Sequence, residues 1–309
     1  MPSFSFDPAN DIPDLTNRVI LVTGGTAGLG KSSILALAVH NPAQIFFTGR
    51  SQSRADGIVD QVRAIAPNIA VTFLSMDLGS AKSIQAAAES LQLKSSRLDI
   101  LMCNAGIMAV PASTTADGYE VQFGTNHLGH AILMRCLLSV LQKTAEQPNA
   151  DVRIISNTST GFQAAPEGGI QFDTLKTEQE MGQGGRWLRY GQSKLANILY
   201  TQEMARRHPQ ILSLVIHPGV IMTDLVTTLS QEDQEIVKSS NVGKIISEED
   251  GIKNQLWAAT SPREELENGQ FYEPVGTVGS TTKASTDREL AKRLWEWTEE
   301  QIDALITHS

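Results

Sequence analysis

The sequence predicts an α/β fold in which a doubly wound parallel sheet is flanked by helices, with residues 1–309 forming a single domain. Strand-like apolar runs alternate with longer helix-like segments along the chain, as they do in parallel βαβ units. A hydrophobic content of 41% supports a substantial core. Folds of this class reach roughly 250 to 300 residues as one unit, so the length does not require a second domain.

The first predicted unit carries a glycine pattern. An apolar run at 18–23 leads into a glycine-rich turn and then a helix-like segment at 31–39. Gly24 permits a tight reversal, Gly28 lets the backbone approach a pyrophosphate, and Gly30 lets the helix pack close to the sheet. The N–H groups at the start of the helix would face the anion. A glycine turn without a ligand is the alternative, but the flanking strand and helix favour a Rossmann-type dinucleotide site.

The end of the second predicted strand indicates which dinucleotide is bound. Residues 44–48 form this strand, and Arg50 follows where an NAD-binding protein normally has an acidic residue for the ribose 2′-hydroxyl. A guanidinium is a permanently charged donor suited to a 2′-phosphate. The sequence therefore favours NADP(H) over NAD(H) as the cofactor.

Tyr190 and Lys194 are the most informative pair in the chain. Their spacing of four residues places a phenol and an ammonium on one face of a helix. A nearby cation favours the phenolate, so we expect Lys194 to lower the pKa of Tyr190 from its usual value of about 10 toward the range where it exchanges protons.

With these features, the chain resembles the short-chain dehydrogenase/reductase family over about residues 17–225, particularly its retinol-dehydrogenase-like and secondary-metabolism members. The resemblance adds further motifs, and the expected cofactor-binding residues are then as follows: Gly24, Thr26, Gly28, Leu29, Gly30, Arg50, Asp77, Leu78, Asn104, Ala105, Gly106, Tyr190, Lys194, Pro218, Gly219, Val220 and Thr223. Within this set the family likeness implies that Asp77 contacts the adenine and that Val220 and Thr223 hold the carboxamide and diphosphate.

The resemblance also implies an oxidoreductase that transfers a hydride between the nicotinamide of NADP(H) and a carbonyl or secondary alcohol. Tyr190 would be the general acid or base, Ser159 would polarise the substrate oxygen, and Lys194 would bind the nicotinamide ribose. Asn126 would order a water that connects Lys194 to solvent. Thr158 replaces Ser159 only if the strand before it is bulged, because a shift of one residue turns the hydroxyl to the opposite face.

Two segments are expected to form the substrate side, namely an insertion at 160–189 and a lid at 224–250. Phe162, Trp187 and Leu225 are the candidate apolar contacts, which indicates a hydrophobic small-molecule substrate. The alternative for the insertion is a surface loop remote from the substrate.

The two ends of the chain are a leader at 1–16 and a helix at 285–306. Thr286 and Glu289 have the spacing of a capping box, and Leu290, Leu294 and Trp297 share a stripe that we expect to pack on the domain. A homodimer formed through helices, including the one with Tyr190, is a further prediction from the resemblance.

Composition excludes several classes. A net charge of −9 without a long basic run argues against nucleic acid. The acidic leader does not fit a secretory signal, and each apolar stretch is too short or too interrupted to span a membrane, so we expect a cytoplasmic protein. Cys103 and Cys136 are expected to be buried, reduced thiols, and His127 and His130 without a third ligand do not predict a metal site.

Two other functions remain open at this point. The first is a non-redox enzyme on the same scaffold, such as a cyclase, lyase or epimerase, in which bound NADP(H) only orders the pocket. The second is a cofactor-sensing module without catalysis. The presence of Asn126, Ser159, Tyr190 and Lys194 together argues against the non-redox enzyme, because a site without hydride chemistry need not retain all four.

Overall fold

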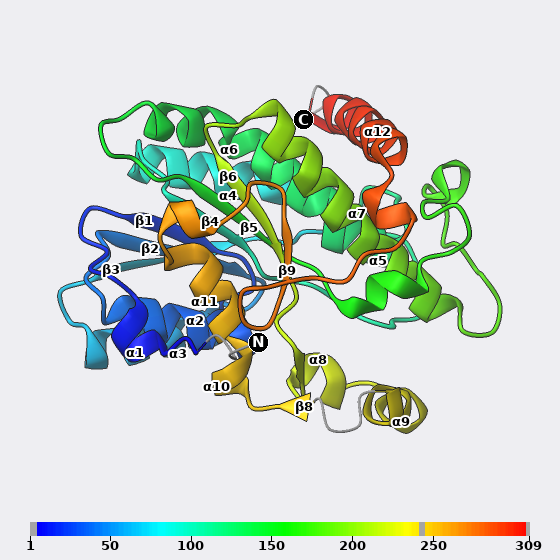
Figure 1. Ribbon diagram of the computed structural model, residues 1–309, viewed down its shortest axis with the longest axis horizontal. Coiled ribbons are helices and arrows are strands. Elements are labelled where there is room, and N and C mark those ends of the chain that lie inside the picture. Colours follow the sequence, from blue (N-terminus) through cyan, green and yellow to red (C-terminus); the bar gives the residue numbers. More distant parts are fainter. Residues whose placement is uncertain (1–4, 241–244, 307–309) are drawn as a thin grey trace.

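The computed structural model describes residues 5–240 and 245–306 and is built around one eight-stranded sheet (Figure 1). The strand order is β10-β9-β6-β5-β4-β1-β2-β3. The strands are β1 (Val19–Val22), β2 (Gln44–Gly49), β3 (Ala70–Ser75), β4 (Ile100–Cys103), β5 (Arg153–Asn157), β6 (Leu212–Ile216), β9 (Phe271–Glu273) and β10 (Thr277–Val278).

The chain winds outward from the middle of the sheet in both directions. It runs from β1 to β2 and β3, then crosses back to place β4 on the other side of β1, and continues through β5, β6 and β9. These strands pair in parallel, and within the described residues of this sheet β10 is the strand that runs antiparallel. The predicted doubly wound α/β fold is confirmed, and the point where the strand order reverses lies between β1 and β4.

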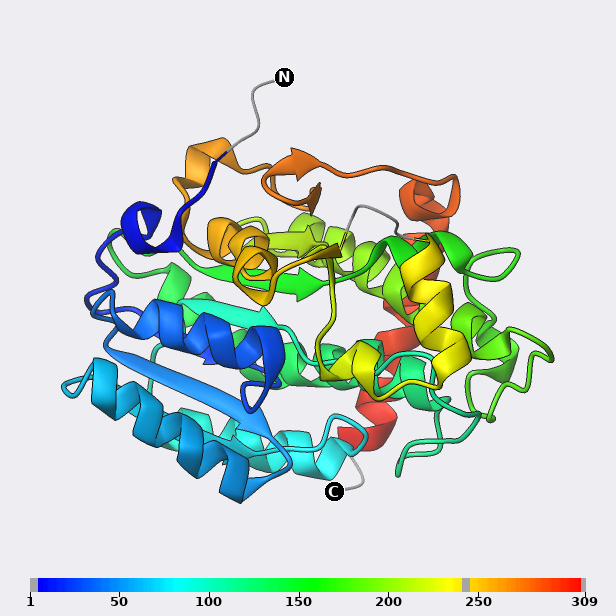
Figure 2. The same cartoon turned by 90° about the horizontal axis from the view of Figure 1, so that it is seen from below.

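Helices cover both faces of the sheet (Figures 1 and 2). One apolar cluster joins the sheet to α2 (Gly28–Ala38), α3 (Gln52–Ile65) and α11 (Lys253–Thr260). On the opposite face, a second cluster joins it to α4 (Ala81–Lys94), α6 (Gly129–Ala145), α7 (Gly185–Arg207) and α12 (Arg288–Ile306). Strands buried on both faces explain the continuous apolar runs in the sequence.

Shorter elements follow the carboxyl ends of the strands. They are α5 (Val121–Phe123), the π-helix η1 (Gly124–Leu128), the 3-10 helices η2 (Thr160–Ala164) and η3 (Phe172–Thr174), β7 (Val220–Ile221), α8 (Asp224–Thr227), α9 (Gln231–Ser240), β8 (Ile245–Ile246) and α10 (Glu248–Gly251). Residues 241–244 of the predicted lid lie outside the described residues.

The terminal segments pack on the body of the protein. In the leader, α1 (Pro8–Asp11) is followed by Ile12 and Leu15, which are buried in the cluster with α2 and α3. At the other end, 3-10 helices η4 (Arg263–Glu265) and η5 (Ala284–Thr286) precede α12, whose residue Leu294 is fully buried. A single chain does not test the predicted homodimer.

The predicted capping box of the last helix is wrong by one residue. The Asp287 carboxylate, not the Thr286 hydroxyl, accepts hydrogen bonds from the backbone N–H groups of Glu289 and Leu290, each at 3.0 Å. Thr286 instead donates to the carbonyl of Thr282, because it still belongs to the preceding 3-10 turn. Aspartate at this position also places its negative charge at the positive end of the helix dipole.

Three further expectations concerned membrane spans, metal sites and the cysteines. Among the helices in the described residues, none combines the length and apolar character needed to cross a bilayer. The described residues also contain no group of three or more His, Cys, Asp or Glu side chains arranged to hold a metal. Cys103 is buried, which raises the pKa of its thiol, whereas Cys136 is only partly buried.

Candidate active site

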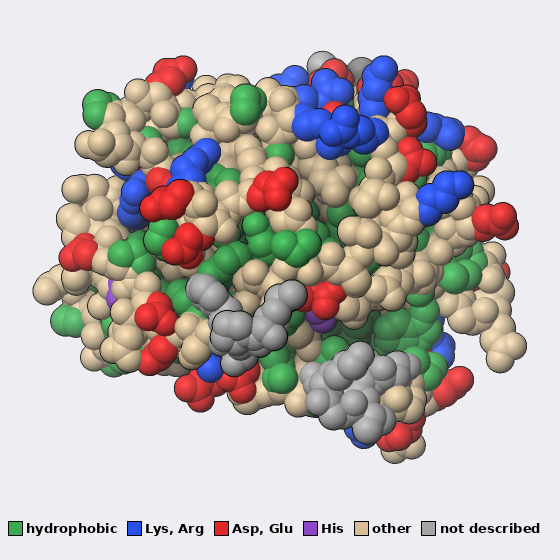
Figure 3. All heavy atoms as spheres, in the orientation of Figure 1, with side chains coloured by type: hydrophobic (Ala, Val, Ile, Leu, Met, Phe, Trp, Pro, Cys, Tyr) green, Lys and Arg blue, Asp and Glu red, His purple; other side chains and the backbone are tan. Residues whose placement is uncertain are grey.

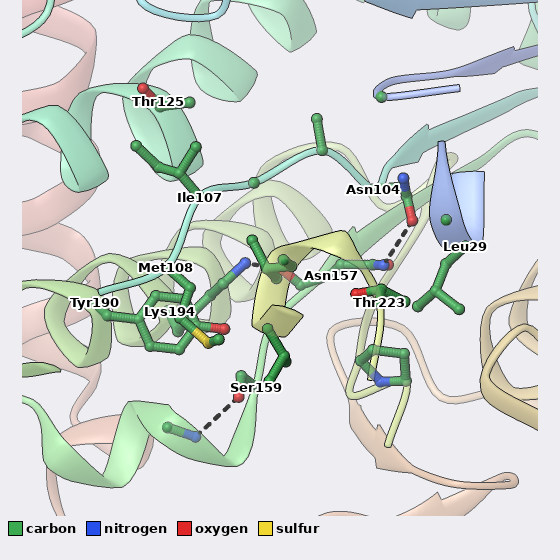
Figure 4. Close-up of a pocket in the computed structure, with 18 of the residues that line it drawn as sticks. Leu29, Asn104, Ile107, Met108, Thr125, Asn157, Ser159, Tyr190, Lys194 and Thr223 are labelled. Carbon is green, nitrogen blue, oxygen red and sulfur yellow. Dashed lines mark hydrogen bonds between the residues drawn. The ribbon is translucent and has the colours of Figure 1, made fainter. Parts of the chain in front are cut away.

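A cleft of about 1480 Å³ lies beyond the carboxyl ends of the central strands, where open parallel sheets bind ligands. Its lining comes from the segments after β1 through β6 and from the stretch that follows β9. In Figure 4, Leu29, Asn104 and Thr223 lie toward one side of this pocket, and Tyr190, Lys194 and Met108 lie toward the other. The cleft therefore has a first side, which contains Leu29, Asn104 and Thr223, and a second side, which contains Tyr190, Lys194 and Met108.

The glycine turn forms the first side. Gly24 and Gly28 have φ angles of +67° and +48°, a region that L-residues with a side chain rarely adopt. α2 begins at Gly28, and no side chain in the described part of the chain caps it, whereas Ser51 and Ser80 cap α3 and α4. The first turn of α2 thus presents backbone N–H groups to the cleft, an arrangement that suits a phosphate.

Two glycines permit α2 to pack closely. A Cβ on Gly25 would lie 2.5 Å from Ile34 on α2 and 2.7 Å from Phe47 on β2, so this glycine permits the helix to approach the sheet. Gly30 lies in the first turn of α2, where a Cβ would lie 2.7 Å from the Asn104 amide after β4, so it lets the helix lie close to that end of the sheet. Gly25 was not identified from the sequence, and α2 starts three residues earlier than predicted.

Charged side chains line the part of the first side that follows β2 and β3. Arg50 follows β2 directly, is exposed and lines the cleft together with Arg54 of α3. Asp77 and Leu78 follow β3 and line the same end, with the Asp77 carboxylate accepting from Gly79 N at 2.9 Å. Arg54 was not identified from the sequence, since the first turn of α3 could only be placed from the structure.

The Asn104-Ala105-Gly106 turn connects neighbouring strands. Asn104 donates to the carbonyl of Thr23, and Ala105 N donates to the hydroxyl of Thr23, both at 3.0 Å. Asn157, at the end of β5, donates to the Asn104 side chain at 3.3 Å. The turn after β4 is thereby fixed to both β1 and β5 at the edge where the cleft opens.

Tyr190, Lys194 and Ser159 meet on the second side (Figure 4). Tyr190 and Lys194 lie one turn apart on α7, and the Lys194 Nζ lies 5.7 Å from the centroid of the Tyr190 ring. The ammonium donates to the carbonyl of Asn157 at 3.2 Å. All three side chains line the cleft, although Tyr190 and Lys194 are each only 5% exposed.

The end of β5 leaves Ser159 available and Thr158 engaged. β5 pairs residue for residue with β6 from Arg153 through Asn157, which is a regular register. The Thr158 hydroxyl is buried and donates to the carbonyl of Lys194 at 2.8 Å. Ser159 instead caps η2, lines the cleft and accepts from Gly161 N at 3.1 Å.

The expected lowering of the Tyr190 pKa is wrong for the polypeptide alone. Burial raises the pKa of Tyr190 to about 12, and a hydrogen bond with Ser159 acts in the opposite direction but is the smaller effect. Burial also lowers the pKa of Lys194 to about 8. At neutral pH the site therefore holds a neutral phenol beside an ammonium that is mostly charged.

Asn126 lies in the π-helix η1, one of the places where a helix departs from regular bonding. Its side chain accepts from Ile107 N at 2.8 Å and donates to Ile107 O at 2.9 Å. A Cβ on Gly106 would lie 3.2 Å from Asn126 Oδ1 and 3.4 Å from Lys194 Nζ, so the two side chains border the same small space. Asn126 itself does not line the cleft.

The nicotinamide end of the expected cofactor site follows β6. Pro218, Gly219 and Val220 line the cleft, and Val220 pairs with Ile245 in the small sheet β7-β8. Thr223 directly precedes α8, and a Cβ on Gly28 would lie 3.6 Å from its methyl group, so it lies beside the glycine turn. The residues predicted to bind the cofactor thus converge on one cleft, with Gly30 supporting the turn from behind.

Of the three residues expected to contact substrate, Trp187 and Leu225 line the cleft and Phe162 does not. Phe162 is 1% exposed and packs edge-on against Phe271, with ring centroids 5.7 Å apart. The expectation for Phe162 was wrong because η2 turns this side chain into the core behind Ser159, while its neighbour Gln163 faces the cleft.

Met108, Val237 and Glu273 line the cleft and were not identified from the sequence. Met108, Ala109, Tyr190, Val226 and Val237 form a buried apolar cluster at the substrate end, which we call the Met108 cluster. Met108 directly follows the Asn-Ala-Gly turn, so its position in the sequence was a usable signal. Glu273 lines the same cleft from β9, and no feature of the sequence marked it.

Figure 3 shows one face of the molecule. Lys and Arg side chains gather mainly at the end where α12 lies, and Asp and Glu are spread over the rest of this face. Apolar side chains are visible in a hollow beside the segment α8–α9. Charged side chains of both signs therefore lie on this face, with the basic ones gathered at one end.

A cleft of this construction, with a glycine turn at one side and a Tyr, Lys and Ser group at the other, is typical of dinucleotide-binding oxidoreductases. The short chain dehydrogenase family model matches residues 18–168. The chain is 34% identical over 306 residues to a short-chain dehydrogenase/reductase of Aspergillus calidoustus, drtF, covering 94% of this chain and 95% of that protein. It is 31% identical over 284 residues to human retinol dehydrogenase 11, covering 91% of this chain and 85% of that protein.

Solved structures give the same result. The NADPH-bound carbonyl reductase from chicken fatty liver superposes with a TM-score of 0.62 at 26% identity, covering 86% of this chain and 100% of that one. The chain belongs to the short-chain dehydrogenase/reductase family. It is an oxidoreductase of the kind that acts on CH–OH or C=O groups with a nicotinamide cofactor.

Proposed function

We propose that this protein is an NADP(H)-dependent oxidoreductase that transfers a hydride between the nicotinamide and a carbonyl or secondary alcohol of a hydrophobic small molecule. The observation that carries the proposal is the meeting of Tyr190, Lys194 and Ser159 at one side of a cleft whose other side is the glycine turn. The cytoplasm is the compartment that we assign to this activity.

The residues of the first side fit a dinucleotide. The uncapped start of α2 and the positive φ angles of Gly24 and Gly28 present backbone N–H groups that suit a diphosphate. Arg50 and Arg54 supply positive charge at the end where a 2′-phosphate would lie. The similarity to an NADPH-bound carbonyl reductase supports the same choice of cofactor. When bound, the nicotinamide supplies or accepts the hydride.

Tyr190 is the proton donor in the reducing direction. With a pKa raised to about 12 it is a neutral phenol at neutral pH, ready to protonate a carbonyl oxygen as it gains negative charge. The Ser159 hydroxyl accepts from Gly161 N and has one proton to donate, which would turn from Tyr190 to the same oxygen once substrate is bound. The two hydroxyls together would polarise the carbonyl before hydride transfer.

Lys194 stabilises the charge that remains on Tyr190 after the proton has left. Because its pKa is about 8, it is mostly protonated at pH 7 and loses its charge as the pH rises above that value. We assign it the nicotinamide ribose hydroxyls as well, with a water between Lys194 and Asn126 that returns the proton from solvent. The neutral phenol favours carbonyl reduction near neutral pH, whereas alcohol oxidation requires its deprotonation.

The experiment is NADPH consumption with a panel of aliphatic and aromatic ketones and aldehydes. Tyr190→Phe should lower kcat by about 10²- to 10⁴-fold, because the ring stays and the proton donor is lost, while the Kd for NADPH changes little. Tyr200→Phe is the matched control, since it removes a second buried hydroxyl from α7 that bonds Glu299 instead of facing the cleft. Equal rates for Tyr190→Phe and wild type would refute the assignment.

A further inference from the structure

A buried ion pair lies directly behind the catalytic group. Arg189 precedes Tyr190 in the sequence, and its Nε lies 3.1 Å from Oε1 of Glu120, with the two side chains 4% and 0% exposed. Burying two charges costs free energy that their attraction does not fully return. Neither residue takes part in the mechanism above, so their position requires another explanation.

Arg189 holds two loops by their backbone. Its Nη2 donates to the carbonyl of Val110 at 3.0 Å, and its Nη1 donates to the carbonyl of Gln179 at 3.1 Å. Val110 lies in the loop between β4 and α5, and Gln179 belongs to the insertion at 160–189. The fixed fork of a guanidinium is what allows one side chain to bind a carboxylate and two separate carbonyl groups.

Glu120 ties the same pair to the helix that contains Asn126. Its Oε2 accepts from Phe123 N at 2.6 Å and so caps α5, which runs into the π-helix η1. Its backbone N–H donates to the carbonyl of Leu175 in the insertion at 2.8 Å. The pair therefore joins α5, α7, the insertion and the loop after β4.

The loop from Ile107 to Val110 is held at both of its ends. Asn126 fixes Ile107 through two hydrogen bonds, and Arg189 fixes Val110. Between these anchors lies Met108, which belongs to the Met108 cluster together with Tyr190, and Figure 4 shows it beside the Tyr190 ring. Met108 also lines the cleft, so it forms the wall next to the proton donor.

We propose that Arg189 is a positioning residue, which clamps the Ile107–Val110 loop so that Met108 holds the substrate carbonyl against Tyr190. This inference rests on the proposed function. Since the clamp contacts the substrate side and not the glycine turn, its loss should impair the substrate reaction and leave NADPH binding intact. A displaced wall of this kind costs catalysis because hydride and proton transfer both require close alignment.

The test compares Arg189→Lys with Arg153→Lys. Lysine keeps the positive charge for Glu120 but, as a single point donor, cannot bind both carbonyls in the fork geometry. Arg153 is a matched control, since it is also buried, pairs with Asp151 at 2.5 Å and donates to the carbonyls of Ala258 and Ser261, but it lies at the opposite end of β5 from the cleft. We expect a loss of about 10- to 100-fold in kcat/KM for Arg189→Lys alone, with an unchanged Kd for NADPH.

Hydrogen exchange of the peptide that covers residues 107–110 gives a readout independent of activity. Exchange should be faster in Arg189→Lys and unchanged in Arg153→Lys. Wild-type exchange and wild-type kcat/KM in Arg189→Lys, or equal losses of kcat/KM in both variants, would overturn the clamp. If the wild-type protein reduces no carbonyl compound, the proposed function fails, and the exchange rates still decide whether Arg189 holds the loop.

A double-variant cycle with Met108→Ala separates positioning from general destabilisation. If Arg189 acts through Met108, the double variant should lose about as much kcat/KM as either single variant. Losses that multiply would show that the two residues act independently and would contradict the proposal.

Discussion

The two sides of the cleft differ in how they are built. The cofactor side is made from short turns that directly follow β1, β2, β3, β4 and β6, and each turn is formed by residues adjacent in sequence. The substrate side gathers Met108, Gln163, Val226, Val237 and Glu273, which come from five separate segments. Local sequence thus specifies the first side, whereas long-range packing specifies the second.

The largest expected effect concerns Phe162, which the sequence assigned to the substrate side and the structure places in the core. Because it is packed in the core against Phe271, Phe162→Ala should lower the free energy of unfolding by about 3–5 kcal/mol. Chemical denaturation would measure this loss. The KM for substrate should remain unchanged in the folded fraction.

Trp187→Phe is the companion variant on the cleft side. The Trp187 indole donates to Asp233 and lies edge-on to Tyr190 with centroids 6.3 Å apart. Trp187→Phe should change the KM for substrate more than it changes the free energy of unfolding. A changed KM for substrate with an unchanged free energy of unfolding in Phe162→Ala would contradict the placement of Phe162 in the core.

Arg50 tests the cofactor side. Arg50→Ala should weaken NADPH binding by about 1.5–3 kcal/mol, because a charged hydrogen bond to the 2′-phosphate is lost, and should leave NADH binding unchanged. Arg63→Ala on α3, the helix that follows Arg50, is the control, since Arg63 is exposed, pairs with Asp60 and does not line the cleft. Fluorescence titration with both nucleotides measures the effect, and equal losses for NADPH and NADH would argue against a 2′-phosphate contact.

The free energy of unfolding should depend on pH through His130, which contacts the turn after β1 and the π-helix η1. His130 is buried, approaches Thr23 at 2.9 Å and Asn126 O at 3.0 Å, and burial lowers its pKa to about 4. The unfolded chain binds a proton near pH 6.5 and the folded one only near pH 4, so the free energy of unfolding falls as the pH drops through this window. One such histidine contributes a slope of at most about 1.4 kcal/mol per pH unit.

His130→Gln measures this contribution. The variant should show a shallower fall in stability between pH 6.5 and about 4 than the wild type, as judged by denaturation at several pH values. An identical slope in both proteins would mean that His130 titrates normally in the folded state.

The sequence alone predicted the parallel sheet and the turns after its first two strands, whereas β9 and β10 were not predicted. The first two strands were predictable because a buried apolar run followed by a glycine turn and a helix is a strong local signal. The start of α2 and the cap of α12 were displaced by a few residues, since several polar or glycine residues adjoin each helix end.

The substrate side could not be predicted to the same depth. The insertion and lid were placed on the cleft, but the direction of the Phe162 side chain depends on its partner Phe271, which lies more than 100 residues away. The pKa of Tyr190 failed for a related reason, because sequence spacing reveals the neighbouring ammonium and not the burial that outweighs it. The contacts of Arg189 could not be predicted either, since one of its backbone acceptors, Val110, lies 79 residues away in the sequence.

The most direct test of the account follows the hydride itself. NADPH carrying deuterium at both C4 positions is incubated with the protein and a ketone that the panel identifies as a substrate, and the product alcohol is analysed by mass spectrometry and NMR. The account predicts one deuterium on the carbinol carbon for each NADPH consumed, and loss of this product in Tyr190→Phe. Product formed without deuterium, while NADPH remains unchanged, would contradict it and identify a non-redox reaction.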